Sequence, residues 1–357
     1  MNENETMIQE LNIVKFRGLK SLNIKNLSRI NVFVGANNCG KTSVLEAIKI
    51  LSAPKDIGQL VTVALHRSGA NIEQRKRNLV NYLLSVFQQG HESDEDKEKN
   101  YSIEMSMSMK THLYRYDADG TIGDVINSAG YSKQAIDIAI GTSENNKKMT
   151  YETRRIINGE EYVFEPTERP IIKTLFVPST INHYQSCVRC LSDYMLREGK
   201  ADIMKILRSF DSDIEDISII GEDIYLYNLN SGSLPLFAYG LGLQKAVLLS
   251  AIIVNFQDGV VLIDEIDNAI HVSAFENVFK WFVKACKDYN VQAFITTHSV
   301  EAIDAIISSA NDECNEDNSL RIITLRNDAK CNITRYKMRD RKQAIEDREQ
   351  FGMELRV

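Results

Sequence analysis

The stretch VFVGANNCGKTSVLEAI, residues 32–48, decides the fold. An apolar run ends at Gly35, and a helical pattern begins at Ser43. Between them, GANNCGKT fits G-x-x-x-x-G-K-[ST], the phosphate-binding loop of nucleoside triphosphatases. The strand pattern before it and the helix pattern after it are the context that this motif requires. We therefore expect a phosphate-binding site here rather than a chance glycine-rich turn.

Each residue type in this loop has a chemical purpose. Glycines let backbone amides turn inward around phosphates, and the N-terminus of the following helix adds its positive end. Lys41 would reach the β and γ oxygens, and the Thr42 hydroxyl would bind Mg²⁺. The sequence thus predicts ATP and Mg²⁺ as cofactors. The predicted ATP-binding residues are Gly35, Asn37, Asn38, Cys39, Gly40, Lys41, Thr42 and Ser43.

A second apolar run, GVVLIDEIDNAIH at residues 259–271, ends in two acids. Its pattern predicts a strand buried on both faces that delivers Asp264 and Glu265 to its carboxyl end. Asp264 would hold Mg²⁺ through water, and Glu265 would polarise the attacking water. Together with the phosphate loop, the pair predicts hydrolysis of the nucleotide and not binding alone.

A third strand end, AFITTHS at residues 293–299, carries His298. A histidine there can donate a hydrogen bond to the γ-phosphate and so report its presence. Spacing alone favours a structural histidine, but the position of His298 after the acidic pair favours a functional one. The predicted catalytic residues are Glu265, His298 and Lys41.

The order of the apolar runs predicts an α/β architecture. Strand and helix patterns alternate in the last third of the chain, which indicates a mainly parallel sheet with sites at the carboxyl ends of its strands. The sequence predicts one half of an ATPase core at 1–51 and the other at 171–330, which carries the acidic pair and His298. Alternating runs predict an inserted antiparallel and helical lobe at 52–170, and a tail follows at 331–357.

Composition limits the classes of partner. The 357 residues carry a formal net charge of −7, which gives no reason to expect tight nonspecific binding to nucleic acid. A local basic patch stays open, with a solvated helix face as the alternative. No apolar run reaches the roughly 18 residues that cross a bilayer, so we expect a cytoplasmic protein without a membrane partner. The patch residues are Arg67, Arg75, Lys76 and Arg77.

Six short motifs together carry a family resemblance. They are KFRGLKS (15–21), GANNCGKT (35–42), YGLGLQKAVLL (239–249), LIDEIDNAIH (262–271), TTHS (296–299) and GMELR (352–356). With them the chain resembles the ABC/SMC-type ATPases, and among these the ATPase part of the OLD (overcoming lysogenization defect) family and its AAA-15 and AAA-21 relatives. The resemblance implies a P-loop ABC-type ATPase fold with a mainly parallel core sheet, an inserted antiparallel β lobe and a helical subdomain.

The same resemblance implies a head-to-tail homodimer, or a higher homo-oligomer, with ATP between the Walker A loop of one subunit and the signature motif of the other. The signature maps to 238–244, ahead of a helix expected near Lys245. Ala238 and Leu241 are apolar where the family usually has serine and a polar or acidic residue, so hydrolysis would be slow or conditional. The implied signature residues are Tyr239, Gly240, Gly242 and Gln244, and the implied D-loop residues are Asp267 and Asn268.

The resemblance also frames the cellular role. OLD-type chains often carry a TOPRIM nuclease with a glutamate and an Asp-x-Asp pair, and the residues after His298 show no such pattern. We therefore expect an ATPase that controls a separately encoded nuclease or toxin in bacterial antiphage defence. A DNA-repair ATPase of the RecF or SMC-like kind and a transport or nucleotide-binding regulatory subunit are alternatives. The glutamine of the Q-loop stays unassigned, with Gln88 and Gln89 as candidates.

Overall fold

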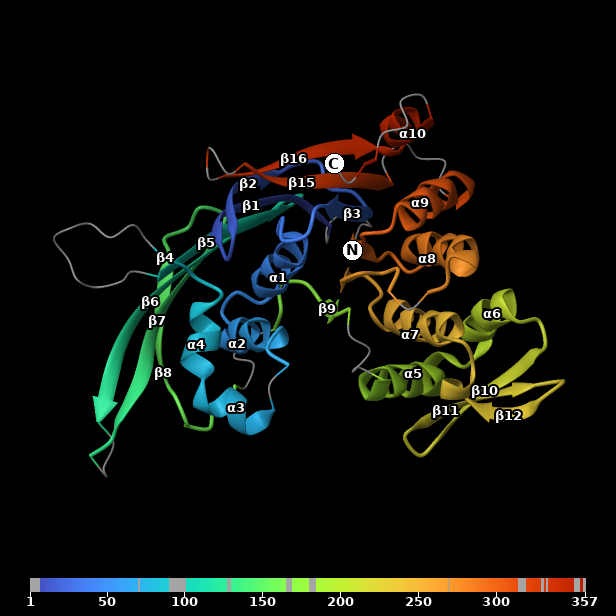
Figure 1. Ribbon diagram of the computed structural model, residues 1–357, viewed down its shortest axis with the longest axis horizontal. Coiled ribbons are helices and arrows are strands. Elements are labelled where there is room, and N and C mark those ends of the chain that lie inside the picture. The colour runs from blue at the N-terminus through green and yellow to red at the C-terminus, as the bar shows by residue number, and fades with distance from the viewer. Residues whose placement is uncertain are drawn as a thin grey trace. The chain divides into compact units, whose positions relative to one another are not determined.

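A computed structural model gives the structure of the chain (Figure 1). Among the helices it describes, none is long and apolar enough to span a membrane. The described residues are 7–69, 71–89, 101–126, 130–164, 169–179, 184–268, 270–313, 319–328, 331, 333–349 and 354–355.

The chain divides into two compact units. The first comprises Met1–Leu27, Asn37–Ile172 and Leu325–Tyr336, and the second comprises Ser28–Ala36, Lys173–Thr324 and Lys337–Val357. The boundary at Ala36 falls inside the phosphate loop, so β3 (Ile30–Gly35) belongs to the second unit and the helix after the loop to the first.

The first unit is built on a seven-stranded sheet in the order β2-β1-β5-β6-β7-β8, with β4 paired to β5. Every pairing in it is antiparallel, as the alternating runs predict. The sequence did not indicate that the two N-terminal strands join this sheet, where Leu11 pairs with Met107. The strands are β1 (Ile8–Phe16), β2 (Leu19–Ile24), β4 (Gln88–Gln89), β5 (Tyr101–Met109), β6 (Leu113–Ile126), β7 (Ser132–Glu144) and β8 (Thr150–Ile157).

Four helices accompany this sheet. They are α1 (Lys41–Leu51), α2 (Ile57–His66), α3 (Ile72–Arg77) and α4 (Leu79–Leu84). Helix α1 contacts β5 and β6, and α4 contacts β7 and β8. Helices α3 and α4 are separate because the backbone breaks at Asn78 (φ −122°, ψ 20°). The Asn78 side chain donates to the Gln74 carbonyl at 3.3 Å, the local hydrogen bonding by which asparagine competes with a helix.

A buried ion cluster holds α1 in this unit. Glu46 on α1 is fully buried, and its carboxylate lies 2.8 Å from Arg17 Nε and 2.7 Å from Arg67 Nη2. Arg67 also donates to the Ser43 hydroxyl at 3.2 Å. Burial lowers the pKa of Arg17, and the Glu46 carboxylate opposes that shift. Helix α1 is therefore tied to Arg17, directly after β1, and to Arg67, directly after α2.

Replacing Glu46 by alanine should destabilise the protein by about 3–5 kcal/mol, because it leaves the buried Arg17 guanidinium without its counter-charge. The free energy of unfolding from urea titration measures this. Glu73→Ala, which removes the exposed partner of Arg77, is the matched control and should change little. Equal effects of the two substitutions would contradict the role of Glu46.

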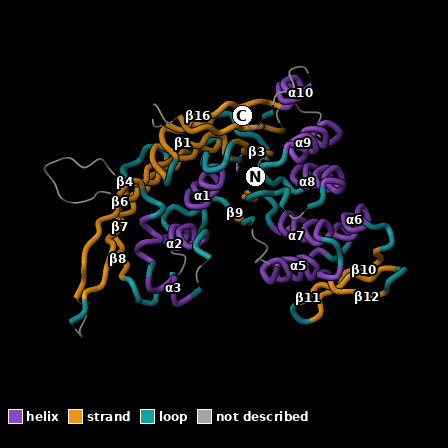
Figure 2. Tube along the Cα trace, in the orientation of Figure 1, coloured by secondary structure: helices purple, strands orange, loops and turns teal. Residues whose placement is uncertain are grey.

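Most of a six-stranded sheet in the order β16-β15-β3-β14-β13-β9 belongs to the second unit, and the parts of β15 and β16 within Leu325–Tyr336 belong to the first. Strands β3, β14, β13 and β9 pair in parallel, so the predicted α/β architecture is confirmed. Helices α7, α8 and α9 share one apolar core with these strands (Figures 1 and 2). The elements are β9 (Thr174–Val177), β13 (Val260–Ile263), β14 (Gln292–Thr296), β15 (Leu320–Asp328), β16 (Ile333–Asp340), α7 (Leu241–Asn255), α8 (Phe275–Asp288), α9 (Val300–Glu313) and α10 (Arg341–Glu349).

A helical subdomain with a small sheet completes this unit. Helices α5 (Tyr184–Glu198) and α6 (Ala201–Phe210) pack on α7, and β10 (Ile214–Ile220), β11 (Asp223–Asn228) and β12 (Gly232–Pro235) form an antiparallel sheet. Helices α5 and α6 are separated at Gly199, whose φ of 82° is a left-handed conformation that ends helices.

Candidate functional site

Three strands of the second unit end at one edge of the parallel sheet. Ile263 pairs with Ile295, and Thr296 pairs with Phe33. Because the strands run in the same direction, Gly35 at the end of β3, the acids after β13 and the TTHS motif after β14 follow the same edge. The predicted phosphate loop thus begins at the same sheet edge as the predicted acidic pair, with β14 between them.

The phosphate loop needs glycine where the sequence has it. Gly35 has a φ of 141° and Gly40 a φ of 99°, and Asn38 between them also has a positive φ of 61°. A Cβ added at Gly40 would lie 2.3 Å from Leu19 Cδ2, so the Leu19 side chain would have to move, and the φ of 99° itself favours glycine. Asn327 donates to the Asn38 carbonyl at 3.1 Å and braces the loop.

The loop's side chains divide into exposed and buried ones. Asn37 and Asn38 are exposed, whereas Cys39 and Lys41 are buried. Lys41 Nζ lies 3.8 Å from Cys39 Sγ. Thr42 is half-buried in the first turn of α1, next to the buried Ser43. The general motif does not specify a thiol beside the lysine ammonium.

One hydroxyl organises the acidic pair. Thr296, fully buried at the end of β14, donates to Asp264 Oδ1 at 2.7 Å and accepts from the Glu265 backbone N–H at 2.8 Å. The Asp264 N–H donates to the Val177 carbonyl at 2.9 Å. The Asp264 carboxylate is therefore oriented by β14, and the backbone of the two acids is held by β14 and β9.

Glu265 has a strained backbone. Its φ is 48°, a left-handed conformation that is uncommon for a residue other than glycine, asparagine or aspartate. Such conformations cost about 1–3 kcal/mol, cluster at functional sites and persist where the surroundings enforce them. Here the Thr296 hydroxyl and the Asn268 N–H, which donates to the Glu265 carbonyl at 2.9 Å, hold the backbone.

His298 lies beside Glu265. Its Nε2 is 3.9 Å from Glu265 Oε1, and both side chains are partly exposed. The Thr297 N–H donates to the Phe33 carbonyl at 3.3 Å. Ser299 Oγ accepts from the Ala302 N–H at 3.0 Å and so caps α9. The turn that presents His298 is thus fixed on both sides.

Two residues, one in each unit, carry oxygen donors of the kind that Mg²⁺ prefers. The ion prefers hard oxygen donors and keeps part of its water shell when it binds a nucleotide. Thr42 offers a hydroxyl, and Asp264 offers a carboxylate whose orientation Thr296 fixes.

The signature segment differs from expectation in one respect. Helix α7 begins at Leu241 and not near Lys245, because Gly240 already occupies the N-cap position (φ −59°, ψ 148°). Gly242 and Gln244 therefore lie in the first turns of the helix. Gln244 Nε2 donates to the Tyr239 carbonyl at 2.8 Å and braces the segment. A Cβ at Gly240 would meet no atom of the described residues within 4 Å, so packing within this part of the chain does not explain a glycine there.

The D-loop candidates have contrasting surroundings. Asn268 Nδ2 donates to the Ser179 carbonyl at 2.9 Å. Asp267 Oδ1 is buried and has no hydrogen-bond partner within the described part of the chain. The nearby His271, whose role the sequence does not reveal, accepts from the Ser273 N–H at 3.3 Å and caps a short 3-10 helix.

Two further sequence candidates are only partly placed. Gln88 lies buried in β4, and its side-chain amide donates to the Leu19 carbonyl, which gives it a structural role. The side chain of Gln89 lies outside the described residues. Of GMELR, only Glu354 and Leu355 are described, and the Leu355 carbonyl accepts from Thr324 Oγ1 at 2.6 Å.

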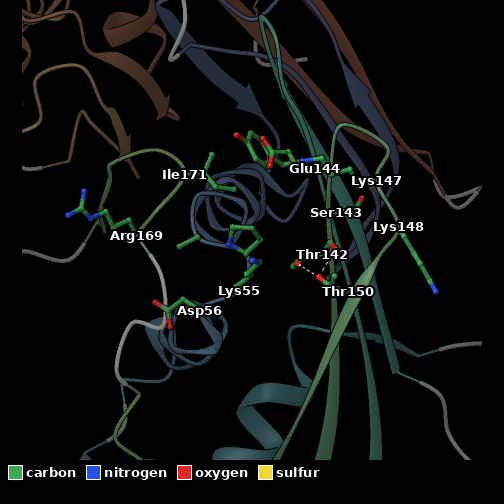
Figure 3. A pocket seen from close by; sticks show the side chains of 13 residues that line it. Lys55, Asp56, Thr142, Ser143, Glu144, Lys147, Lys148, Thr150, Arg169 and Ile171 are labelled. Atoms are coloured by element: carbon green, nitrogen blue, oxygen red, sulfur yellow. Dashed lines mark hydrogen bonds between the residues drawn. The ribbon is translucent and has the colours of Figure 1, made fainter. Parts of the chain in front are cut away.

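A pocket in the first unit contains none of the predicted site residues. Figure 3 shows Lys148 and Arg169 directed away from each other, while Thr142 and Thr150 form one wall. The charged groups do not converge on one point, so we assign it no role. Its lining residues are Ala53, Pro54, Lys55, Asp56, Tyr114, Thr142, Ser143, Glu144, Lys147, Lys148, Thr150, Arg169 and Ile171.

Comparison with known proteins settles the family. The AAA_21 model, described as "AAA domain, putative AbiEii toxin, Type IV TA system", matches residues 30–304. The chain belongs to this AAA domain family. The parallel pairing of β3, β14, β13 and β9 and the glycine-rich loop after β3 agree with a P-loop α/β fold for this AAA domain.

Similar proteins include an ATP/GTP phosphatase of Helicobacter pylori, 21% identical over 331 residues that cover 84% of this chain and 87% of that protein. The DNA replication and repair protein RecF of Acinetobacter baylyi is 47% identical over 45 residues, 13% of each chain. Among solved structures, the SMC head domain from Thermotoga maritima has a TM-score of 0.46 at 12% identity, covering 92% of this chain and 98% of that one.

Thr296 gives a direct test of the acidic pair. Thr296→Val removes the hydroxyl but keeps the shape, and we expect ATP turnover to fall about 10–100-fold while nucleotide binding persists, the size of effect seen when groups that orient a metal ligand are lost. Thr296→Ser keeps the hydroxyl and should stay close to the unmodified protein. Equal turnover of the two variants would contradict the bridging role.

Proposed function

We propose that this protein hydrolyses ATP to ADP and phosphate and that it does so as a nucleotide-gated homodimer. The observation that carries the proposal is the Thr296-bridged Asp264 and Glu265 pair at the sheet edge where the phosphate loop begins. A mere phosphate-binding loop needs no such pair. Hydrolysis needs a carboxylate for Mg²⁺ and a second one for the attacking water.

The proposed roles follow from the chemistry of each side chain. Lys41 and the N-terminal amides of α1 bind the β- and γ-phosphates of ATP. Thr42 and Asp264 hold Mg²⁺, which neutralises charge that develops on the phosphate oxygens. Glu265 accepts a proton from the attacking water, and His298 donates a hydrogen bond to the γ-phosphate. The 3.9 Å approach of His298 to Glu265 lets the two act on one reacting group.

Three features of the second unit support the dimer. The signature segment presents Gly240 with open space where a side chain would be, which suits close approach to a phosphate. Phe237 next to it is 66% exposed. Asp267 keeps a buried oxygen without a partner in the described chain. A second subunit that covers the signature and the D-loop would satisfy all three, with Tyr239, Gly242, Gln244 and Asn268 in the same interface.

If the protein hydrolyses ATP, two substitutions should affect ATP binding and ATP turnover differently. Lys41→Ala should lose ATP binding and turnover together. Glu265→Gln should keep ATP binding and lose turnover by a factor of about 10²–10⁴, the usual contribution of a general base. Equilibrium nucleotide binding and phosphate release measure the two quantities. Unchanged turnover of Glu265→Gln would contradict its role as the base.

If each ATP site is built from two subunits, two inactive variants should restore activity when they are mixed. Gly240→Asp places a carboxylate against the γ-phosphate, whereas aspartate at an N-cap favours the helix, so the subunit itself stays folded. Lys41→Ala and Gly240→Asp should each be inactive, and their mixture should regain turnover because each mixed dimer has one complete site. Gly240→Asn, equally suited to the cap but neutral, is the control and should retain more activity. Failure of the mixture would show that signature and loop act within one chain.

We propose further that ATP binding controls a separately encoded effector, a nuclease or toxin, in antiphage defence. The family description, which refers to a toxin–antitoxin system, supports this class of role. The test compares two tagged variants purified from native cells: Glu265→Gln, which should stay bound to ATP, and Lys41→Ala, which should not bind it. The two should carry along different amounts of the protein encoded by a neighbouring gene. Capture of no nuclease or toxin by either variant would contradict the proposal.

A DNA-repair ATPase is the second candidate, and the 45-residue similarity to RecF favours it. The basic residues suggested by the sequence do not favour it, because Arg67, Lys76 and Arg77 pair with Glu46, Glu161 and Glu73. The test is whether duplex DNA stimulates ATP turnover. Stimulation that is lost when Arg75, Lys76 and Arg77 are neutralised would favour this role.

A further inference from the structure

Strand β8 forms an edge of the seven-stranded sheet and is open to solvent over most of its length. It pairs with β7 on one side, and it ends the strand order on the other. Residues 150–155 are all exposed, and Tyr151 is 62% exposed. An open edge of this kind is a template for pairing with another strand.

Two hydrogen bonds show which backbone groups of β8 face outward. The Asn158 N–H donates to the Gln134 carbonyl across the ladder to β7 at 3.0 Å. The preceding Ile157 N–H instead donates to the Tyr162 hydroxyl at 2.7 Å, on the other side. In an antiparallel ladder, residues alternate between these two directions. Tyr151, Thr153 and Arg155 therefore direct their N–H and C=O groups away from β7.

The outward groups define where a new strand fits. Tyr162 already occupies the Ile157 N–H, so the open stretch is limited to Tyr151, Thr153 and Arg155. No described residue pairs with the outward side of these three. An incoming antiparallel strand centred on Thr153 would form hydrogen bonds at all three positions.

If two copies of β8 pair with each other, the charged side chains of this stretch place opposite charges across the contact in one register only. Glu152 and Arg154 lie on one face of β8, 3.3 Å apart and about half exposed. If two copies of β8 pair around Thr153, Glu152 lies opposite the partner's Arg154, twice over. A register centred on Glu152 or on Arg154 would instead place like charges directly opposite each other, which destabilises a strand pair.

We propose that β8 pairs with β8 of a second copy of this chain, antiparallel and centred on Thr153. The two open edges close each other in a two-fold symmetric contact, as most homo-oligomer interfaces do. The occupant is a second copy because the charge sequence of the edge matches itself. This contact needs no nucleotide, and it is separate from the proposed ATP-dependent interface.

Sedimentation velocity of the full chain without nucleotide, over a range of protein concentrations, tests the contact. Glu152→Arg and Arg154→Glu should each weaken self-association by about tenfold, because attractive pairs become repulsive ones. The double variant Glu152→Arg/Arg154→Glu restores opposite charges across the contact and should restore association. Loss in each single variant followed by recovery in the double variant is the result expected if the two positions face each other across the contact.

Two outcomes would overturn the proposal: a chain that is monomeric at all concentrations without nucleotide, or self-association that both single variants leave unchanged. Thr153→Pro adds a check that does not depend on charge. The Thr153 N–H faces away from β7, so proline spares the existing ladder, and thermal unfolding verifies the fold. This variant should be monomeric without nucleotide. Because no ATP is present, failure of this contact leaves the proposed ATP-driven dimer untouched.

Discussion

The geometry of the acidic pair depends on the Thr296 hydroxyl, a single group that forms hydrogen bonds between the ends of two neighbouring strands. It donates to the Asp264 carboxylate and accepts from the Glu265 N–H. Without it, a buried carboxylate would lose a hydrogen bond, and a strained backbone at Glu265 would lose its restraint. Parallel strands bring β3, β13 and β14 to one edge, but this hydroxyl converts the edge into a defined arrangement of acids.

Much of the fold could be predicted from the sequence because the decisive patterns are local. Strand, glycine turn and helix around Gly35 to Ser43 are specified by consecutive residues, and so is the buried run before Asp264. Long-range pairing was harder to predict. Nothing local indicates that β1 joins β5, about 90 residues away in the chain, because strand pairing depends on contacts that a single strand's pattern does not encode.

The candidate site likewise combines features that local motifs predict with features that depend on long-range contacts. The identities of the loop residues, the acidic pair and His298 follow from motifs, whereas the bridging role of Thr296 and the left-handed backbone at Glu265 depend on how two strands meet. The start of α7 was misplaced because Gly240 acts as an N-cap through its backbone conformation, a choice that the GLG pattern alone leaves open. Asn78 and Gly199 likewise end helices that an apolar pattern extends.

The central claim is that ATP joins two subunits through half-sites that are incomplete alone. The most direct measurement is the solution mass of Glu265→Gln with and without ATP and Mg²⁺, with Thr153→Pro added so that the β8 edge does not contribute. Our account predicts that the mass doubles when ATP is added and returns to that of one chain when ATP is removed. A mass that is the same in both conditions, with ATP demonstrably bound, would contradict it.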